Sequence, residues 1–159
     1  MKNWILIFAL IFGASCQRHE INEYNINKVQ VNSDGHQKKN LKSDVQFISL
    51  LYSDLYETSI SSDKLNKLEL LQSSFGDKNV VIQRISQNML SDPLAVIPTD
   101  SVMFNQTKDF IINTYNKFLT RQPTEAEIWF LEDLISKNPK LTAKEFYYGF
   151  ITSEEYKYY

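Results

Sequence analysis

The amino-acid sequence predicts an all-α protein: two similar three-helix units that form one small helical bundle, behind a signal peptide and a flexible tether. Apolar residues from about residue 44 onward recur every three or four positions, the spacing of one helix face. Two Thr-x-x-Glu patterns mark helix starts, and the two halves resemble each other at an offset of 63 residues. The expected boundaries are signal peptide 1–15, tether 16–43, first unit 44–92, linker 93–103 and second unit 104–159.

The first 15 residues have the three-part layout of a secretory signal. Lys2 supplies a positive start, an apolar run (WILIFALIF) follows, and small residues close the segment. The apolar run has about ten residues, whereas a membrane-spanning helix needs about 20. We therefore expect a signal that is removed from the mature chain.

Cys16, the only cysteine of the chain, follows this signal directly. The stretch "GASC" resembles the lipobox of bacterial lipoproteins, although Gly13 stands where that motif usually has leucine. The resemblance implies cleavage before Cys16, a diacylglycerol on its sulfur, and acyl chains such as palmitate that anchor the protein in a membrane. It also implies a cell-envelope location, at the periplasmic or surface face of the outer membrane. The alternatives are an uncleaved helix or a secreted protein with a stray thiol.

The stretch after Cys16 is rich in Asn, Gln, Lys and Ser and holds few large apolar residues. Such a composition cannot bury enough apolar area to offset the entropy of ordering the chain. Residues 16–43 are therefore expected to be a disordered tether between the membrane and the folded part.

The first helical unit is predicted from three apolar stripes. A segment with two prolines, "SDPLAVIPTD" (91–100), then breaks the pattern and indicates a linker. The expected core positions of the first unit are Phe47, Ile48, Leu51 and Leu55, then Leu65, Leu68 and Leu71, then Val81, Ile82, Ile85 and Met89.

The second unit shows the same periodicity with clearer helix starts. Thr124 with Glu127, and Thr142 with Glu145, each predict a capping box, in which the hydroxyl and the carboxylate satisfy free amides of the first turn. A capping role for these glutamates competes with a catalytic one, and we favour capping. The expected core positions are Phe110, Ile111, Tyr115, Phe118 and Leu119, then Ile128, Leu131, Leu134 and Ile135, then Phe146, Phe150 and Ile151.

The two halves align as a repeat. "FISLLYSDLY" (47–56) lies over "FIINTYNKFL" (110–119), and the same offset places Leu65 on Ile128 and Leu68 on Leu131. We interpret this as a duplicated unit whose helices need one another to cover their apolar faces. Chance similarity between amphipathic helices is the alternative.

Residues 110–159 resemble the phycobilisome-linker-like domain and a related bacterial domain of unknown function. The core of that pattern is matched by Tyr115, Leu119, Arg121, Pro123 and Thr124, with Thr120 where the families have glycine. Its closing part is matched by Phe146, Phe150, Ile151, Ser153, Glu155 and Tyr156. The resemblance implies an all-helical packing unit used for protein association.

Arg121 follows one expected helix and precedes the cap of the next, so a structural role is favoured over ligand binding. Its guanidinium could donate to the last carbonyls of the preceding helix. It could also donate to a carboxylate such as Glu125 or Glu155.

The expected folded region lacks the residue types of most catalytic sites. Both histidines, His19 and His36, lie in the tether, and no cysteine follows residue 16. This removes Ser–His–Asp and Cys–His catalysis and zinc sites built on His or Cys. A formal net charge of −2 gives no reason to expect a nucleic-acid partner. We therefore predict no enzyme activity, no cofactor and no metal.

The alternative enzyme hypothesis is a carboxylate-dependent hydrolase of glycan or peptidoglycan. It requires two carboxylates about 5–10 Å apart that face one cleft. The candidates are Glu125, Glu127, Glu132, Asp133, Glu154 and Glu155.

Aromatic residues are abundant near the C-terminus, and tyrosine suits a recognition surface because its ring is apolar and its tip is polar. The leading hypothesis is a lipid-anchored envelope module that binds another envelope protein through an exposed patch of Trp129, Tyr147, Tyr148 and Tyr156. A tyrosine-rich rim that only seals the core is one alternative. A spacer lipoprotein without a specific partner and without an exposed apolar patch is another.

Overall fold

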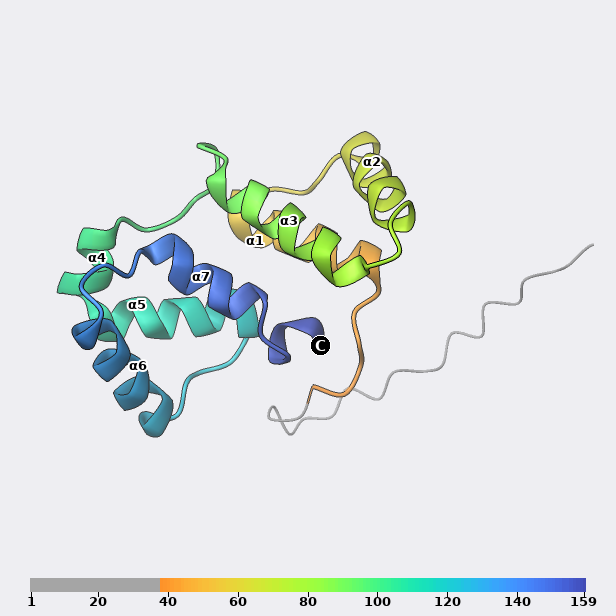
Figure 1. The fold of residues 1–159 in the computed structure, drawn as a ribbon. Coiled ribbons are helices and arrows are strands. Elements are labelled where there is room, and N and C mark those ends of the chain that lie inside the picture. Colours follow the sequence, from red (N-terminus) through yellow and green to blue (C-terminus); the bar gives the residue numbers. More distant parts are fainter. Residues whose placement is uncertain (1–37) are drawn as a thin grey trace, which may run out of the picture. The chain divides into compact units, whose positions relative to one another are not determined.

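A computed structural model describes residues 38–159 and shows an all-helical fold (Figure 1). The described part contains seven α-helices, one π-helical turn and one 3-10 turn, and its only β-type pairing is an isolated bridge between Leu41 and Tyr158. The all-α fold class is therefore confirmed. The signal peptide, Cys16 and the tether as far as residue 37 lie outside the described residues.

The first half contains α1 (Asp44–Tyr56), α2 (Ser62–Ser73) and α3 (Lys78–Ser91). The side chains of Ser43, Ser61 and Asp77 cap these helices by accepting hydrogen bonds from first-turn amides, which would otherwise have no partner. All four core positions expected on α1 are buried, as are Val81, Ile85 and Met89 on α3.

The apolar stripe expected on α2 is only partly correct. Leu65 and Leu68 pack against the core, but Leu71 is exposed and the neighbouring Gln72 is buried instead. Successive residues of a helix lie about 100° apart around its axis. Gln72 is therefore closer than Leu71 to the face that Leu65 and Leu68 occupy.

The second half contains α4 (Asp100–Asn105), α5 (Thr107–Thr114), the π-helical turn η2 (Tyr115–Leu119), α6 (Glu125–Lys137), α7 (Ala143–Ile151) and the 3-10 turn η3 (Glu155–Lys157). Helix α4 begins inside the expected linker 93–103, because Thr99 caps it by accepting from the Val102 amide. Gln106, with φ −128° and ψ 46°, then separates α4 from α5. The predicted capping boxes at Thr124–Glu127 and Thr142–Glu145 are both present.

The bounds of the elements repeat at the offset found in the sequence. Adding 63 to α1 (44–56) gives 107–119, the range of α5 plus η2, and adding 63 to α2 (62–73) gives 125–136, within one residue of α6. Glu57 and Thr120, also 63 apart, are the two non-glycine residues of the described part with positive φ, at 54° and 53°. Each ends the first long helical segment of its unit in the left-handed conformation, which Thr120 adopts without the glycine of the family pattern.

The two halves pack through their third helices, α3 and α7, which lie side by side in Figure 1. Aromatic rings fill the second half of the core. The Phe110 ring lies 5.1 Å from that of Phe146, and the Phe118 ring lies 4.8 Å edge-on from that of Tyr147, measured between centroids. This packing holds α7, one wall of the cleft described below, against α5 and η2.

The end of the expected tether belongs to the folded part. The Lys42 amide donates to the Lys157 carbonyl at 2.8 Å, and the Tyr159 amide donates to the Asn40 carbonyl at 3.0 Å. Residues 40–42 therefore run antiparallel to residues 157–159, which corrects the expectation of disorder up to residue 43. The tether composition could not show this pairing because it uses backbone groups only.

Candidate functional site

Two of the four aromatic residues expected on a binding surface lie in the core instead. Tyr147 is 3% exposed and Tyr156 is 1% exposed. Tyr147 falls on the same face of α7 as Ala143, Phe146 and Ile151, all of them buried, so helix geometry directs it inward. The proposed patch that included these tyrosines is therefore wrong.

Tyr156 joins η3 to the first half of the chain. Its hydroxyl donates to Asp54 Oδ2 at 2.8 Å, and its ring meets Phe47 and Phe118 edge-on. Lys42 Nζ lies 3.8 Å from the ring centroid and donates to the Tyr156 carbonyl. Burial lowers the pKa of Lys42 to about 8 and raises the pKa of Asp54. The role of Tyr156 is structural.

Trp129 and Tyr148 are accessible to different degrees. Trp129, on α6, is 70% exposed, as expected for a contact residue. Tyr148 is half-buried and accepts a long 3.4 Å hydrogen bond from Gln87 Nε2, which places it at the contact between α7 and α3. Of the predicted surface, Trp129 remains the strongest candidate.

The structure shows a second exposed aromatic residue on α6, Phe130, next to Trp129 in the sequence. It also shows a cleft that the sequence did not indicate. Phe130 is 60% exposed and lines a cleft of about 400 Å³ between α6 and α7, which we call the α6–α7 cleft. Its apolar lining consists of Tyr115, Leu119, Phe130, Leu131, Leu134, Leu141, Phe146 and Phe150. A mostly apolar concave site with a few polar groups is typical of ligand and partner binding.

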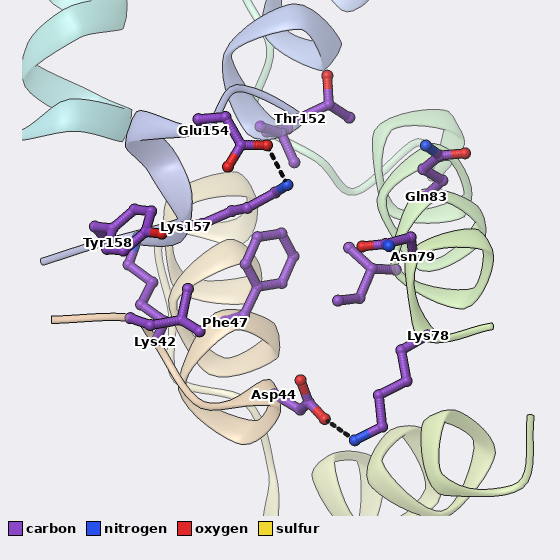
Figure 2. Close-up of a pocket in the computed structure, with 13 residues that line it drawn as sticks. Lys42, Asp44, Phe47, Lys78, Asn79, Gln83, Thr152, Glu154, Lys157 and Tyr158 are labelled. Carbon is purple, nitrogen blue, oxygen red and sulfur yellow. Dashed lines mark hydrogen bonds and ion pairs between the residues drawn. The ribbon is translucent and has the colours of Figure 1, made fainter. Parts of the chain in front are cut away.

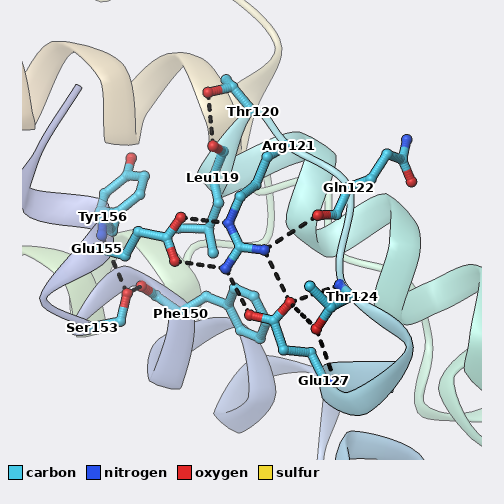
Figure 3. A network of polar contacts seen from close by, with 10 residues as sticks. All are labelled: Leu119, Thr120, Arg121, Gln122, Thr124, Glu127, Phe150, Ser153, Glu155 and Tyr156. Atoms are coloured by element: carbon cyan, nitrogen blue, oxygen red, sulfur yellow. Dashed lines mark hydrogen bonds and ion pairs between the residues drawn. The ribbon is translucent and has the colours of Figure 1, made fainter. Parts of the chain in front are cut away.

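Arg121 lines the cleft and joins the segment after η2 to α6 and η3 (Figure 3). Its Nε and Nη2 donate to Glu155 at 2.6 and 2.8 Å, and its Nη1 and Nη2 donate to Glu127 at 3.0 and 2.7 Å. The guanidinium also lies 4.8 Å from the centroid of the Tyr115 ring. The Glu155 contact agrees with the sequence expectation, whereas the second carboxylate is Glu127 and not Glu125.

The carboxylates along the cleft are held in the ionised form. Hydrogen bonds from Arg121 lower the pKa of Glu127 to about 2 and also lower the pKa of Glu155. Glu145, which also lines the cleft, accepts from the Thr142 amide and hydroxyl, and these bonds lower its pKa. The cleft therefore carries three carboxylates and one guanidinium at neutral pH.

The repeat provides an internal comparison for the exposed aromatic residues. At the offset of 63, Trp129 and Phe130 correspond to Asn66 and Lys67 on α2, and all four side chains are exposed. Helix α2 forms at the same place in its unit with polar residues at these positions, as solubility favours. The fold of the unit therefore does not require Trp129 and Phe130 to be aromatic.

A second cleft, of about 680 Å³, lies where α1, α3, the end of α7 and η3 meet (Figure 2). Its walls carry two ion pairs, Lys78–Asp44 at 2.9 Å and Lys157–Glu154 at 2.6 Å. The charged groups of these pairs neutralise each other, and the pair on η3 removes Glu154 from the set of free carboxylates.

Of the other acid-base candidates, Glu127 and Glu155 are the two that line the α6–α7 cleft. Glu127 and Glu155 share Arg121, and Asp133 pairs with Lys137 on the exposed side of α6 at 2.7 Å. Glu125 occupies the first turn of α6, where a negative charge stabilises the helix. Residues 38–159 contain no group of three or more His, Cys, Asp or Glu side chains placed to hold a metal ion.

Within residues 38–159, none of the helices combines the length and the apolar character that crossing a membrane requires. Comparison of the chain with known protein families, with curated proteins and with solved structures finds no match. The functional argument therefore depends on the chain's own residues.

Proposed function

We propose that the chain is a lipid-anchored helical module of the cell envelope that binds another envelope protein. The contact surface comprises Trp129, Phe130 and the α6–α7 cleft. The observation that supports this most strongly is the internal comparison, because the equivalent helix of the first unit has Asn66 and Lys67 at the same two exposed positions. Large exposed aromatic side chains beside an apolar cleft are typical of the energetically dominant part of a protein interface.

The lipid anchor rests on the sequence alone, through the signal-like segment and the single cysteine at its end. Two acyl chains anchor a protein stably in a bilayer, whereas a single chain gives only marginal membrane binding. Glu127 and Glu155 are both paired with Arg121, so they give no specific support to the hydrolase alternative. The exposed aromatic pair argues against a spacer without a partner.

Replacing both aromatic residues in the full-length chain tests the proposed contact. We expect Trp129→Ala/Phe130→Ala to reduce crosslinks from Lys137, Lys140 and Lys144 to the partner by about tenfold or more, because exposed aromatic anchors contribute most of the binding energy of such surfaces. The measurement is crosslinking mass spectrometry in the native envelope.

The matched control is Asn66→Ala/Lys67→Ala, at the equivalent positions of the first unit, which should leave the crosslinks unchanged. Equal crosslinks from the folded aromatic variant and the parent would refute the proposed contact. In the same fractions, Cys16→Ser should abolish fatty-acid labelling and release the chain from the membrane. A parent chain found free in the cytosol with unmodified Cys16 would refute the anchor.

A further inference from the structure

Gly149 is a glycine in the interior of α7 that the fold does not explain. It lies between residues with helical backbone and has no positive φ, so its conformation suits any residue. A Cβ at this position would meet nothing within 4 Å, so packing within the described chain does not require glycine either. Glycine is unfavourable in helix interiors compared with alanine.

The position of Gly149 gives the glycine a role, because it lines the α6–α7 cleft. A glycine on a helix surface allows another backbone or a bulky side chain to approach the helix closely. The neighbouring wall residues, Phe146 and Phe150, are large and pack against each other at 5.2 Å between ring centroids, so Gly149 forms a notch in the surface of α7 beside this aromatic pair. Such a notch suits an occupant that lies across α7.

The charge of the cleft restricts the occupant further. Arg121 is the only cation among the residues that line it, and Glu127, Glu145 and Glu155 are the anions, so the lining carries a net charge of −2. Arg121 is already bonded to two of these carboxylates. An occupant with positive charge beside its apolar surface complements this lining, whereas an anionic lipid surface does not.

We propose that the α6–α7 cleft receives an amphipathic helix of the partner protein, with Lys or Arg residues flanking its apolar stripe. This inference rests on the proposed function and specifies the chemistry of its partner. The apolar side chains enter between Phe130 and Phe146, and the partner backbone passes close to Gly149. A helix is favoured over an extended segment because the cleft lies between two helices, and an extended segment binds best at the edge of a sheet.

The probe is a displayed library of helical peptides that share apolar residues at i, i+3, i+4 and i+7 and vary among Lys, Gln and Glu at the flanking positions. The target is the full-length chain in a neutral detergent, with binding to empty micelles subtracted. We expect selection to enrich Lys at the flanks. The strongest peptide should bind Gly149→Leu about tenfold more weakly than the parent, because the leucine side chain fills the notch.

Two further variants separate binding from folding. Gly149→Ala should raise the thermal midpoint, because alanine favours the helix, and should still weaken peptide binding. Glu145→Gln keeps the capping box, since glutamine also fulfils that role. It removes one negative charge and should weaken peptides with Lys flanks more than those with Gln flanks.

Several results would overturn the inference. They are failure to select any peptide, selection without a preference for Lys, and unchanged binding by both Gly149 variants. A dimer of the chain that Gly149→Leu dissociates would also overturn it, because the occupant would then be a second copy. None of these results bears on the envelope crosslinks of the Trp129/Phe130 variant, so failure of this inference and failure of the proposed function are distinguishable.

Discussion

Gln72 is a polar residue at a core position of α2. It is 1% exposed, and neither Nε2 nor Oε1 of its side chain has a hydrogen-bond partner among the described residues. Its counterpart in the second unit, Ile135, is also 1% exposed and is apolar. A buried polar group without a partner costs about 1–3 kcal/mol, so Gln72 marks a weak position in the first unit.

We expect Gln72→Ile to raise the free energy of unfolding by about 1–3 kcal/mol, because the substitution removes an unpaired amide and reproduces the residue of the second unit. Urea denaturation followed by circular dichroism measures the change. Gln83→Ile, on the exposed side of α3, is the control and should change the free energy by less than about 0.5 kcal/mol. A Gln72→Ile variant less stable than the parent would show that the amide has a stabilising partner.

The individual residues of the binding surface could be predicted only in part. The exposure of Trp129 agrees with the expectation, but Tyr147 and Tyr156 are buried. Composition identifies an excess of tyrosines without saying which of them point inward. Phe130 was missed because no apolar stripe included it, and the comparison of its position with Lys67 was the available signal.

Helix starts were predictable because their causes are local. Each capping box depends on residues three positions apart, so the sequence shows it without knowledge of the fold. The left-handed end at Thr120 and the turn at Gln106 were not predictable in this way, because packing and not residue type sets the backbone there. The contacts of Arg121 were predictable only in part, because Glu127 is near it in the sequence and Glu155 is distant.

The Arg121 network should make the links among η2, α6 and η3 sensitive to acid. The pKa of Glu127 is lowered from an ordinary 4.5 to about 2, so its stabilising contribution is complete above about pH 4.5 and is lost as pH falls toward 2. We expect the free energy of unfolding of the parent to fall over this range, and that of Glu127→Gln to fall less steeply. Urea midpoints at a series of pH values measure the difference.

Glu145→Gln is the matched comparison for this experiment. Glu145 occupies the same capping position in α7 and accepts from Thr142, without an arginine contact like that of Glu127 among the described residues. Its substitution should flatten the acid response less than Glu127→Gln does. Parallel acid responses for the parent and both variants would contradict the role assigned to the Arg121 ion pairs.

The two halves of the described chain are joined by helix packing and by polar contacts. Helices α3 and α7 pack against each other, and Tyr156 reaches Asp54 across 102 positions of sequence. Burial raises the pKa of Asp54, so the Tyr156 hydroxyl supplies an important hydrogen bond to a half-buried carboxylate. The repeat predicted two similar units, but aligning one unit with the other gives no information on the contacts between them, so the sequence did not indicate how the units meet.

Removing the Tyr156 hydroxyl should weaken this junction. We expect Tyr156→Phe to lower the free energy of unfolding by about 1–3 kcal/mol, because Asp54 would stay half-buried without its donor. A double-mutant cycle with Asp54→Asn, measured by urea denaturation, isolates the pairwise energy. Tyr148→Phe, which loses only the long contact with Gln87, is the control, and a cycle with no coupling energy would contradict the junction.

The pairing of residues 40–42 with residues 157–159 has a mechanical consequence. In the proposed arrangement, any pull between membrane and domain enters the fold through residue 38. It would load the two Asn40–Tyr159 hydrogen bonds first and the Lys42–Lys157 bond only after those two have opened. Bonds loaded one after another yield at lower force than bonds sheared together. The pairing of residues 40–42 with residues 157–159 would therefore open before the helices are strained. Its opening would lengthen the tether by a few residues while the core stays intact.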